Sequence, residues 1–400
     1  MSKISNIGTL DVREIQEDLA SNITEMTNIG ILLESEESQA LLKNCKRENI
    51  GVNIKVPLDV KVVMQNGKVK LDRDYLEGFS NPIAIILNGK LTVGEDVDRS
   101  LIDEKIYSII VNGKVICPNK LVGTIQSKGT INGKIVGYRE GYMLIDDLVE
   151  ITDQFLNSLE SDSKLAVNRL MAIKDFDMEL FKEKMSQIQV LSNIIVTEDN
   201  EKLLSKYIDD YYSLSKSLVP VGAKYIDDDL YIDDHSIKRF KDSTLYVDGE
   251  VEIYLEEDIE LDKYIKSLTC ENVICNDLIL DEVIKILEDK DIEVEVIRGK
   301  LIKNNGNMVL SGELDDFDEE ITIRNLGKLV LEKNLDYGRF SEKVALITNY
   351  GLILAPEDKL NIVKNKVKKN LGGIKSLQEK KEVVEEEENI LYSNMGELKL

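Results

Sequence analysis

The chain has 400 residues, of which 42% are hydrophobic and 32% charged, and its formal net charge at pH 7 is −24. This composition is typical of a folded protein rather than a disordered chain. A strongly negative surface repels phosphate backbones and anionic lipids, so nucleic-acid binding is not expected. No stretch reaches the roughly 18 apolar residues of a membrane-spanning helix, so membrane insertion is not expected either.

A glycine phrase recurs from the first residues onward. It reads NIGTLDV, NIGILLE, NIGVNIK, QNGKVKL, LNGKLTV, VNGKVIC and INGKIVG, with glycines at positions 8, 30, 51, 67, 89, 113 and 133. The phrase returns between residues 249 and 396, as in NLGKLVL, NYGLILA and NMGELKL. Apolar residues two and often four positions after the glycine predict a strand with one buried face.

The spacers between these phrases, such as DVREIQEDLA and SEESQALLKN, have helical apolar spacing and acidic first turns. Each repeat of about 22 residues therefore predicts one strand, a turn and a short helix. Such a unit buries its apolar edge only against its neighbours, which is the principle of a repeat protein. We expect an α/β repeat solenoid with a parallel sheet.

A second interpretation of the same phrase stays open. Asn-Gly between apolar runs, as in VVMQNGKVKL and SIIVNGKVIC, is the strongest short-range signal for a β-hairpin. A hairpin followed by a helix, a ββα repeat, also fits a repeat of this length. The phrases NIGTL and NLGKL lack the two-residue turn yet keep the same spacing, and this favours single strands.

Longer segments of the chain are also repeated. Residues 23–57 parallel 188–220, and residues 349–373 align without a gap with 28–52. We expect the following organisation: 1–146, a first solenoid copy; 147–187, a helical inset or junction leading into the second copy; 188–325, the second copy; and 326–400, a partial third copy with a charged helical segment at 378–389.

The architecture resembles the leucine-rich repeat class. The resemblance rests on the regular spacing of the glycine phrase, on Leu and Ile at fixed strand positions and on Asn beside them. It implies a strand and a helix in each repeat. The sequence departs from the usual pattern of that class because its Asn precedes a glycine instead of following the strand.

The four cysteines, Cys45, Cys117, Cys270 and Cys275, are scattered and form no C-x-x-C pair. The first residues show no apolar leader. We therefore expect reduced, mostly buried thiols and a cytoplasmic location. Cys117 and Cys275 end the same Val-Ile-Cys phrase on the buried side of the strand, so a core role is favoured over a reactive one.

Residues that carry catalysis are sparse. The single histidine, His235, is expected at an exposed helix start. Asp227, Asp229 and Asp233 are weak calcium candidates, because their spacing fits no EF-hand loop and solvated turns are the favoured explanation. No P-loop run occurs. We expect no enzyme activity, no catalytic residue and no cofactor.

Lysines stand out on the exposed face of the predicted strands. The candidate partner-binding residues are Lys68, Lys70, Lys90, Thr92 and Lys114. They could receive an acidic partner or another copy of the chain, or they could only improve solubility. Strand phrases lie at both ends of the chain without a polar cap, so head-to-tail self-association is a second expectation, with caps formed by terminal helices as the alternative.

The resulting hypothesis is a non-catalytic protein–protein interaction or structural scaffold protein whose partner is another protein or a second copy. The alternative is a carboxylate-based hydrolase or a calcium-dependent binding protein. A carboxylate set converging in one groove would favour the hydrolase.

Overall fold

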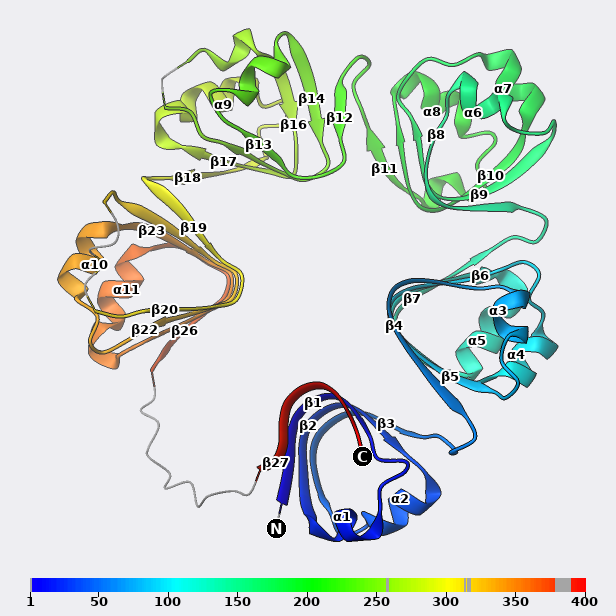
Figure 1. Cartoon of the computed structure of the whole chain (residues 1–400). Helices are drawn as coiled ribbons and strands as arrows, with labels where there is room; N and C mark the ends of the chain where they lie inside the picture. Colours follow the sequence, from blue (N-terminus) through cyan, green and yellow to red (C-terminus); the bar gives the residue numbers. More distant parts are fainter. Residues whose placement is uncertain (1, 257–258, 313, 315–317, 378–389) are drawn as a thin grey trace. The chain divides into compact units, whose positions relative to one another are not determined.

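The computed structural model describes residues 2–256, 259–312, 314, 318–377 and 390–400. In this described part, the strands form seven separate sheets of three or four strands, with short helices between consecutive strands (Figure 1). The expected α/β class is therefore confirmed. The charged segment 378–389, for which a helix is predicted, lies outside the described residues.

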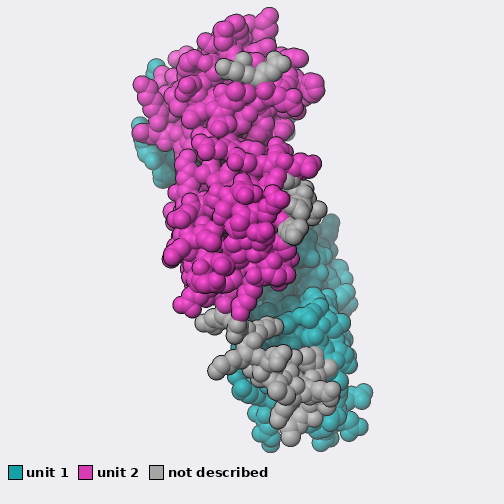
Figure 2. Space-filling view, turned by 90° about the vertical axis from the view of Figure 1, so that its left-hand side faces the viewer, with its two compact units in different colours: residues 1–195, 200–217, 382–400 teal, residues 196–199, 218–381 magenta. Residues whose placement is uncertain are grey.

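The chain divides into two compact units (Figure 2). Unit 1 comprises residues 1–195, 200–217 and 382–400, and unit 2 comprises residues 196–199 and 218–381. Each unit is described by itself below.

Unit 1 contains three four-stranded sheets, with the orders β27-β1-β2-β3, β4-β5-β6-β7 and β11-β10-β9-β8; only the last residues of β10 and β11 belong to unit 2. The strands are β1 (Ser2–Asp11), β2 (Ile23–Glu34), β3 (Lys46–Lys55), β4 (Lys61–Leu71), β5 (Ile83–Val93), β6 (Ile106–Pro118), β7 (Gly129–Tyr138), β8 (Met143–Glu150), β9 (Ser163–Ala172), β10 (Met185–Val196), β11 (Ser215–Leu218) and β27 (Ile390–Lys399).

The helices associated with these sheets are short. They are α1 (Glu17–Asn22), α2 (Glu36–Leu41), α3 (Arg73–Glu77), α4 (Arg99–Lys105), α5 (Val122–Ser127), α6 (Asp153–Asn157), α7 (Met178–Lys184) and α8 (Glu198–Leu204). Several begin at a side-chain cap, as where Asp98 accepts a hydrogen bond from the Leu101 backbone N–H at 2.9 Å. No helix in the described part of the chain is long and apolar enough to span a membrane.

Unit 2 contains four sheets, with the orders β12-β14-β16, β13-β15-β17-β18, β19-β21-β23-β25 and β20-β22-β24-β26. The strands are β12 (Lys224–Ile226), β13 (Leu230–Ile232), β14 (Ser243–Val247), β15 (Glu250–Ile253), β16 (Ile265–Thr269), β17 (Asn272–Asn276), β18 (Glu293–Ile297), β19 (Lys300–Asn304), β20 (Asn307–Leu310), β21 (Ile321–Asn325), β22 (Lys328–Leu331), β23 (Val344–Asn349), β24 (Leu352–Ala355), β25 (Val367–Asn370) and β26 (Gly373–Ser376). The α-helices are α9 (Leu280–Ile286), α10 (Tyr337–Lys343) and α11 (Leu360–Lys366).

The Asn-Gly phrases of unit 1 lie inside single strands and not in hairpin turns. β4 pairs with β5 in parallel, with Asn66 opposite Asn88 and Gly67 opposite Gly89, and β6 and β7 continue the same register. The hairpin-plus-helix alternative is therefore wrong for these phrases. Each strand bends at the phrase, and its two halves flank the short helices (Figure 1).

Glycine is required where the bent strands stack. Gly113 has a φ of +146°, and a Cβ atom there would lie 2.0 Å from the Gly89 carbonyl oxygen. Only glycine combines this backbone conformation with such a close approach. The neighbouring asparagines bond from strand to strand, because Asn112 Nδ2 donates to Asn88 Oδ1 at 2.8 Å.

The repeated parallel strands are consistent with a repeat arrangement, but the described residues do not form one continuous solenoid. At three boundaries between successive stacks, the link between consecutive strands is short and carries no helix. Lys55 is followed by β4 at Lys61, Tyr138 by β8 at Met143, and Ile297 by β19 at Lys300. Without a helix to complete the repeat, the next strand begins a new sheet.

The expected helical character of residues 147–187 is wrong in part. This region contains α6 and α7, but Ser163–Ala172 forms β9, which pairs in parallel with β8. Leu165, Ala166 and Val167 are all fully buried. A strand with both faces buried reads as a continuous apolar run, which does not distinguish a strand from a helix.

The two Val-Ile-Cys phrases end equivalent strands, β6 and β17. Cys117 and Cys275 are fully buried, and burial raises the pKa of each thiol to about 12. The prediction of core thiols is confirmed for both, whereas Cys270 is half-buried.

The last strand of the chain completes the first sheet. β27 pairs in parallel with β1, with Ile7 opposite Met395 and Leu10 opposite Leu398. Asn6 Nδ2 donates to Asn394 Oδ1 at 3.0 Å, which continues the row of asparagines. The edge of β1 that the sequence suggested to be free is therefore covered by the same chain.

Candidate functional site

The lysine-rich face predicted from the sequence lies on β4, β5 and β6 of unit 1, and part of it is engaged within the unit. Lys90 Nζ and Thr92 Oγ1 both donate to the carboxylate of Asp146 on β8, each at 2.7 Å. Lys114 Nζ donates to Asn168 Oδ1 on β9 at 2.7 Å, and burial lowers the pKa of Lys114. These three side chains connect the second and third sheets.

The remaining two lysines border a cavity of about 620 Å³, which Thr92 also lines. Lys68 is exposed and has no hydrogen-bond or ion-pair partner among the described residues. Lys70 forms a 3.5 Å ion pair with Asp72, whose pKa is lowered mainly by the backbone N–H of Tyr75. The cavity lies within the range of roughly 300–1,000 Å³ that is typical of ligand sites.

The opposite wall comes from residues that the sequence did not single out. Tyr142 and Asp146 reach this cavity from the start of the third sheet, and Tyr138 from the end of β7. The Tyr142 hydroxyl donates to Asp209 at 3.0 Å, and burial raises the pKa of this phenol. No local pattern marks these residues, because their position depends on how two sheets pack.

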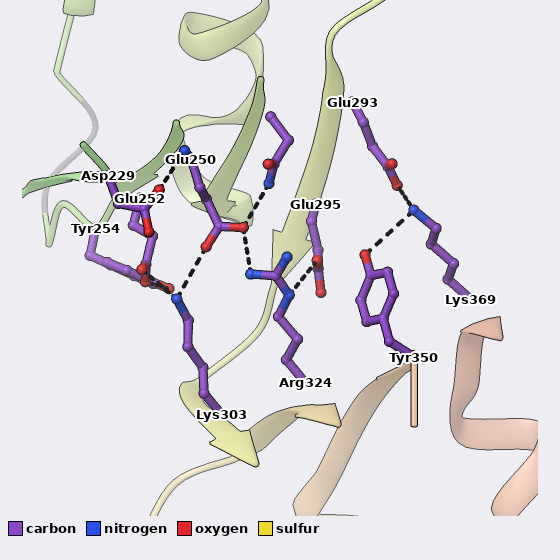
Figure 3. Close-up of polar contacts among 11 residues, drawn as sticks. Asp229, Glu250, Glu252, Tyr254, Glu293, Glu295, Lys303, Arg324, Tyr350 and Lys369 are labelled. Carbon is purple, nitrogen blue, oxygen red and sulfur yellow. Dashed lines mark hydrogen bonds and ion pairs between the residues drawn. The ribbon is translucent and has the colours of Figure 1, made fainter. Parts of the chain in front are cut away.

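Unit 2 contains a charged cluster formed by Glu250, Glu252, Glu295, Lys303 and Arg324 (Figure 3). Glu250 of β15 accepts hydrogen bonds from Arg324 of β21 and, at 2.8 Å, from Asn272 of β17. Lys303 of β19 bonds to Glu252 and lies 3.2 Å from Glu250. The cluster thus connects two sheets of unit 2.

Hydrogen bonds favour the ionised form of Glu250. Burial acts to raise the pKa of Glu250, but hydrogen bonds from Asn272 and Arg324 outweigh it, so the pKa lies below the ordinary value. Only 13% of each of the Glu250 and Arg324 side chains is exposed. Buried pairs of this kind add more to the specificity of packing than to net stability. The arrangement fits a structural joint between the two sheets.

Unit 2 also contains a larger cavity, of about 930 Å³. Its lining includes Tyr231 and Tyr254, whose ring centroids are 5.5 Å apart at an interplanar angle of 32°. The single histidine also lines it. His235 is exposed at the start of the 3₁₀-helix η3 (Ser236–Phe240), as predicted, and its backbone N–H donates to Asp233 Oδ1 at 3.1 Å.

The three calcium candidates make separate contacts. Asp227 accepts a hydrogen bond from the Tyr225 hydroxyl at 3.0 Å, Asp229 accepts from the Glu250 backbone N–H at 2.8 Å, and Asp233 binds the first turn of η3. Among the described residues, no group of three or more His, Cys, Asp or Glu side chains is arranged to hold a metal ion.

Comparisons with protein-family models, with curated proteins and with solved structures found no match.

Proposed function

We propose that the chain is a non-catalytic interaction scaffold that docks a partner protein at the lysine-bordered cavity of unit 1. The observation that carries this proposal is the position of Lys68, Lys70 and Thr92, which the sequence indicates as partner-binding residues and which line one cavity of about 620 Å³. The rigid stacks beneath hold these side chains on strands, and binding groups on strands are placed more precisely than those on loops.

The chemistry of the cavity suits a segment of mixed charge. The ammonium group of Lys68 is available to a carboxylate of the partner. Asp72, Asp74 and Asp96 line the same cavity and would favour a basic residue nearby. The proposed partner segment therefore carries an acidic residue next to basic ones. It differs in this respect from the purely acidic partner that the lysines alone suggest.

The proposal extends to the architecture. Each stack is interpreted as a short solenoid similar in logic to leucine-rich repeats, the copies are assigned to residues 1–146, 188–325 and 326–400, and the chain is placed in the cytoplasm. Self-association through the outer edges of the sheets stays a prediction. Neither the hydrolase nor the calcium-binding alternative has a specific observation in its favour.

The test compares proteins captured from a native lysate by the tagged full-length chain and by two variants. Lys68→Glu with Lys70→Glu reverses the cavity charges, and Lys43→Glu with Lys290→Glu makes the same charge change at exposed positions elsewhere. At least one protein should bind the parent chain and the control but not the cavity variant. Identical captured sets for all three chains would refute docking at this cavity.

A further inference from the structure

We infer that the larger cavity of unit 2, the one lined by Tyr231 and Tyr254, binds an organic cation that carries several ammonium groups. This inference concerns a different unit and a different ligand from the docking proposal, and it does not depend on that proposal.

The tyrosine pair offers an aromatic surface to the cavity. Tyr231, on β13, is 56% exposed, and Tyr254 follows β15 directly and stacks on it. The Tyr254 hydroxyl donates to Glu252 Oε2 at 3.1 Å, which fixes the inner ring. An aromatic face attracts an ammonium or guanidinium group. Burial, followed by the nearby charges of Asp233 and Glu252, raises the pKa of Tyr231 and keeps its phenol neutral.

Several carboxylates surround this aromatic surface, and Lys238 is the one lysine among the lining residues. Glu256 and Glu319 both line the cavity, both are exposed, and neither has a salt-bridge partner among the described residues. Asp234, a third lining carboxylate, accepts only the backbone N–H of Glu256, at 3.3 Å. These groups come from different segments of unit 2, so a ligand with several cationic centres satisfies them better than one with a single centre.

An amide side chain also contributes to the cavity wall. Asn276 lines the same cavity, and its Nδ2 donates to the Leu255 carbonyl oxygen at 2.7 Å. Its Oδ1 is buried and has no hydrogen-bond partner among the described residues. An unpaired buried acceptor is unfavourable, and an N–H donor would satisfy it. Because this oxygen is out of contact with solvent, a ligand in the cavity reaches it only if the Asn276 side chain turns toward the cavity.

Size and overall charge agree with this assignment. The cavity is at the upper end of the range for organic ligands. The described carboxylates form no metal-ligand group, so an organic cation fits better than a metal ion. The net charge of −24 attracts cations to the protein over long range and repels anions. Free polyamines and lysine-rich protein segments share this chemistry.

The test is isothermal titration calorimetry of the full-length chain with spermine and, separately, with a hexalysine peptide, at 20 and 150 mM NaCl. At least one probe should bind saturably. Glu256→Gln with Glu319→Gln should weaken binding about 5- to 20-fold, because two ion pairs are lost. Tyr231→Ala should weaken it about 2- to 5-fold, and Tyr231→Phe should retain it, because the ring face is kept.

Control variants separate this site from nonspecific attraction to an acidic surface. Glu288→Gln with Glu357→Gln removes two exposed carboxylates of unit 2 outside the cavity, and binding should change less than twofold. The inference is overturned if neither probe binds. It is also overturned if Glu288→Gln with Glu357→Gln weakens binding as much as Glu256→Gln with Glu319→Gln does.

Discussion

Asn325 lies at the centre of a buried row of asparagine side chains in unit 2. Its Oδ1 accepts a hydrogen bond from Asn304 Nδ2, and its Nδ2 donates to Asn349 Oδ1, both at 2.7 Å. The corresponding row in unit 1, through Asn88, is exposed to solvent. The sequence shows the recurring Asn and Gly, but not that one row is buried, because burial depends on the surrounding elements.

Substituting one asparagine in each row should reduce stability by different amounts, because only one row is buried. We expect Asn325→Ala to destabilise the protein by about 2–4 kcal/mol, because two neighbours lose a partner inside the protein. Asn88→Ala should cost about 0.5–1 kcal/mol, since water replaces the lost bonds. Chemical unfolding of both variants provides the comparison, and equal losses would contradict the difference in burial.

Glycine substitutions should have opposite effects at two positions, one in the second sheet and one in a neighbouring helix. Gly113→Ala introduces a Cβ where φ is +146° and a carbonyl oxygen is 2.0 Å away, so we expect a loss of at least about 2 kcal/mol. Gly123 lies in α5 with open space around it, and Gly123→Ala should be neutral or stabilising by up to about 1 kcal/mol. Thermal unfolding midpoints measure both, and a stable Gly113→Ala protein would rule out close stacking.

At the scale of elements, the strands are more predictable than their grouping. Period-two alternation identifies β4, β5 and β6, whereas the short apolar runs of β9, interrupted by Asn168 and Arg169, do not distinguish a strand from a helix. The sequence contains one sign of where the first sheet ends. The spacing between Gly51 and Gly67 is shorter than the spacing between the other consecutive glycines of the phrase in the early part of the chain. The missing residues are those of a helix, and the first stack ends at that point. The attachment of β27 to β1 has no local signal, because it joins opposite ends of the chain.

The attachment of β27 can be tested at Leu398, a buried residue of this strand. Leu398 is 9% exposed and packs in the core of the first sheet, whereas Met395 on the same strand is 41% exposed. Leu398→Asp should release β27, because a buried unpaired carboxylate is strongly unfavourable. Hydrogen exchange of β1 amides should then accelerate more than tenfold while β5 stays protected. Met395→Asp should leave β1 protected, and unchanged exchange in Leu398→Asp would show that β27 does not shield β1.

At the scale of the whole molecule, stability should depend on pH through the charged cluster of unit 2. The pKa of Glu250 is lowered in the folded state by Asn272 and Arg324. Its contribution is therefore present above the unfolded pKa, near 4.5, and is lost as pH falls through the lower folded value. We expect Glu250→Gln to be destabilised by about 3 kcal/mol at pH 7, and by less at pH 3.

Urea unfolding of the parent chain and of Glu250→Gln between pH 7 and pH 3 measures this difference. Glu288→Gln, at an exposed position, should match the parent within about 0.5 kcal/mol throughout. A difference between the parent and Glu250→Gln that does not shrink at low pH would show that the ionised carboxylate is not the stabilising group.

The fold depends on parallel, in-register stacking of the glycine phrases. Lys68 lies opposite Lys90, and Lys90 lies opposite Lys114. Neighbouring strands are about 4.8 Å apart, within disulfide reach, whereas strands two apart are about 9.6 Å away and beyond it. Mild oxidation followed by peptide mass spectrometry should therefore detect a disulfide in Lys68→Cys with Lys90→Cys and none in Lys68→Cys with Lys114→Cys. No disulfide in the first variant, or equal formation in both, would contradict the stacked arrangement.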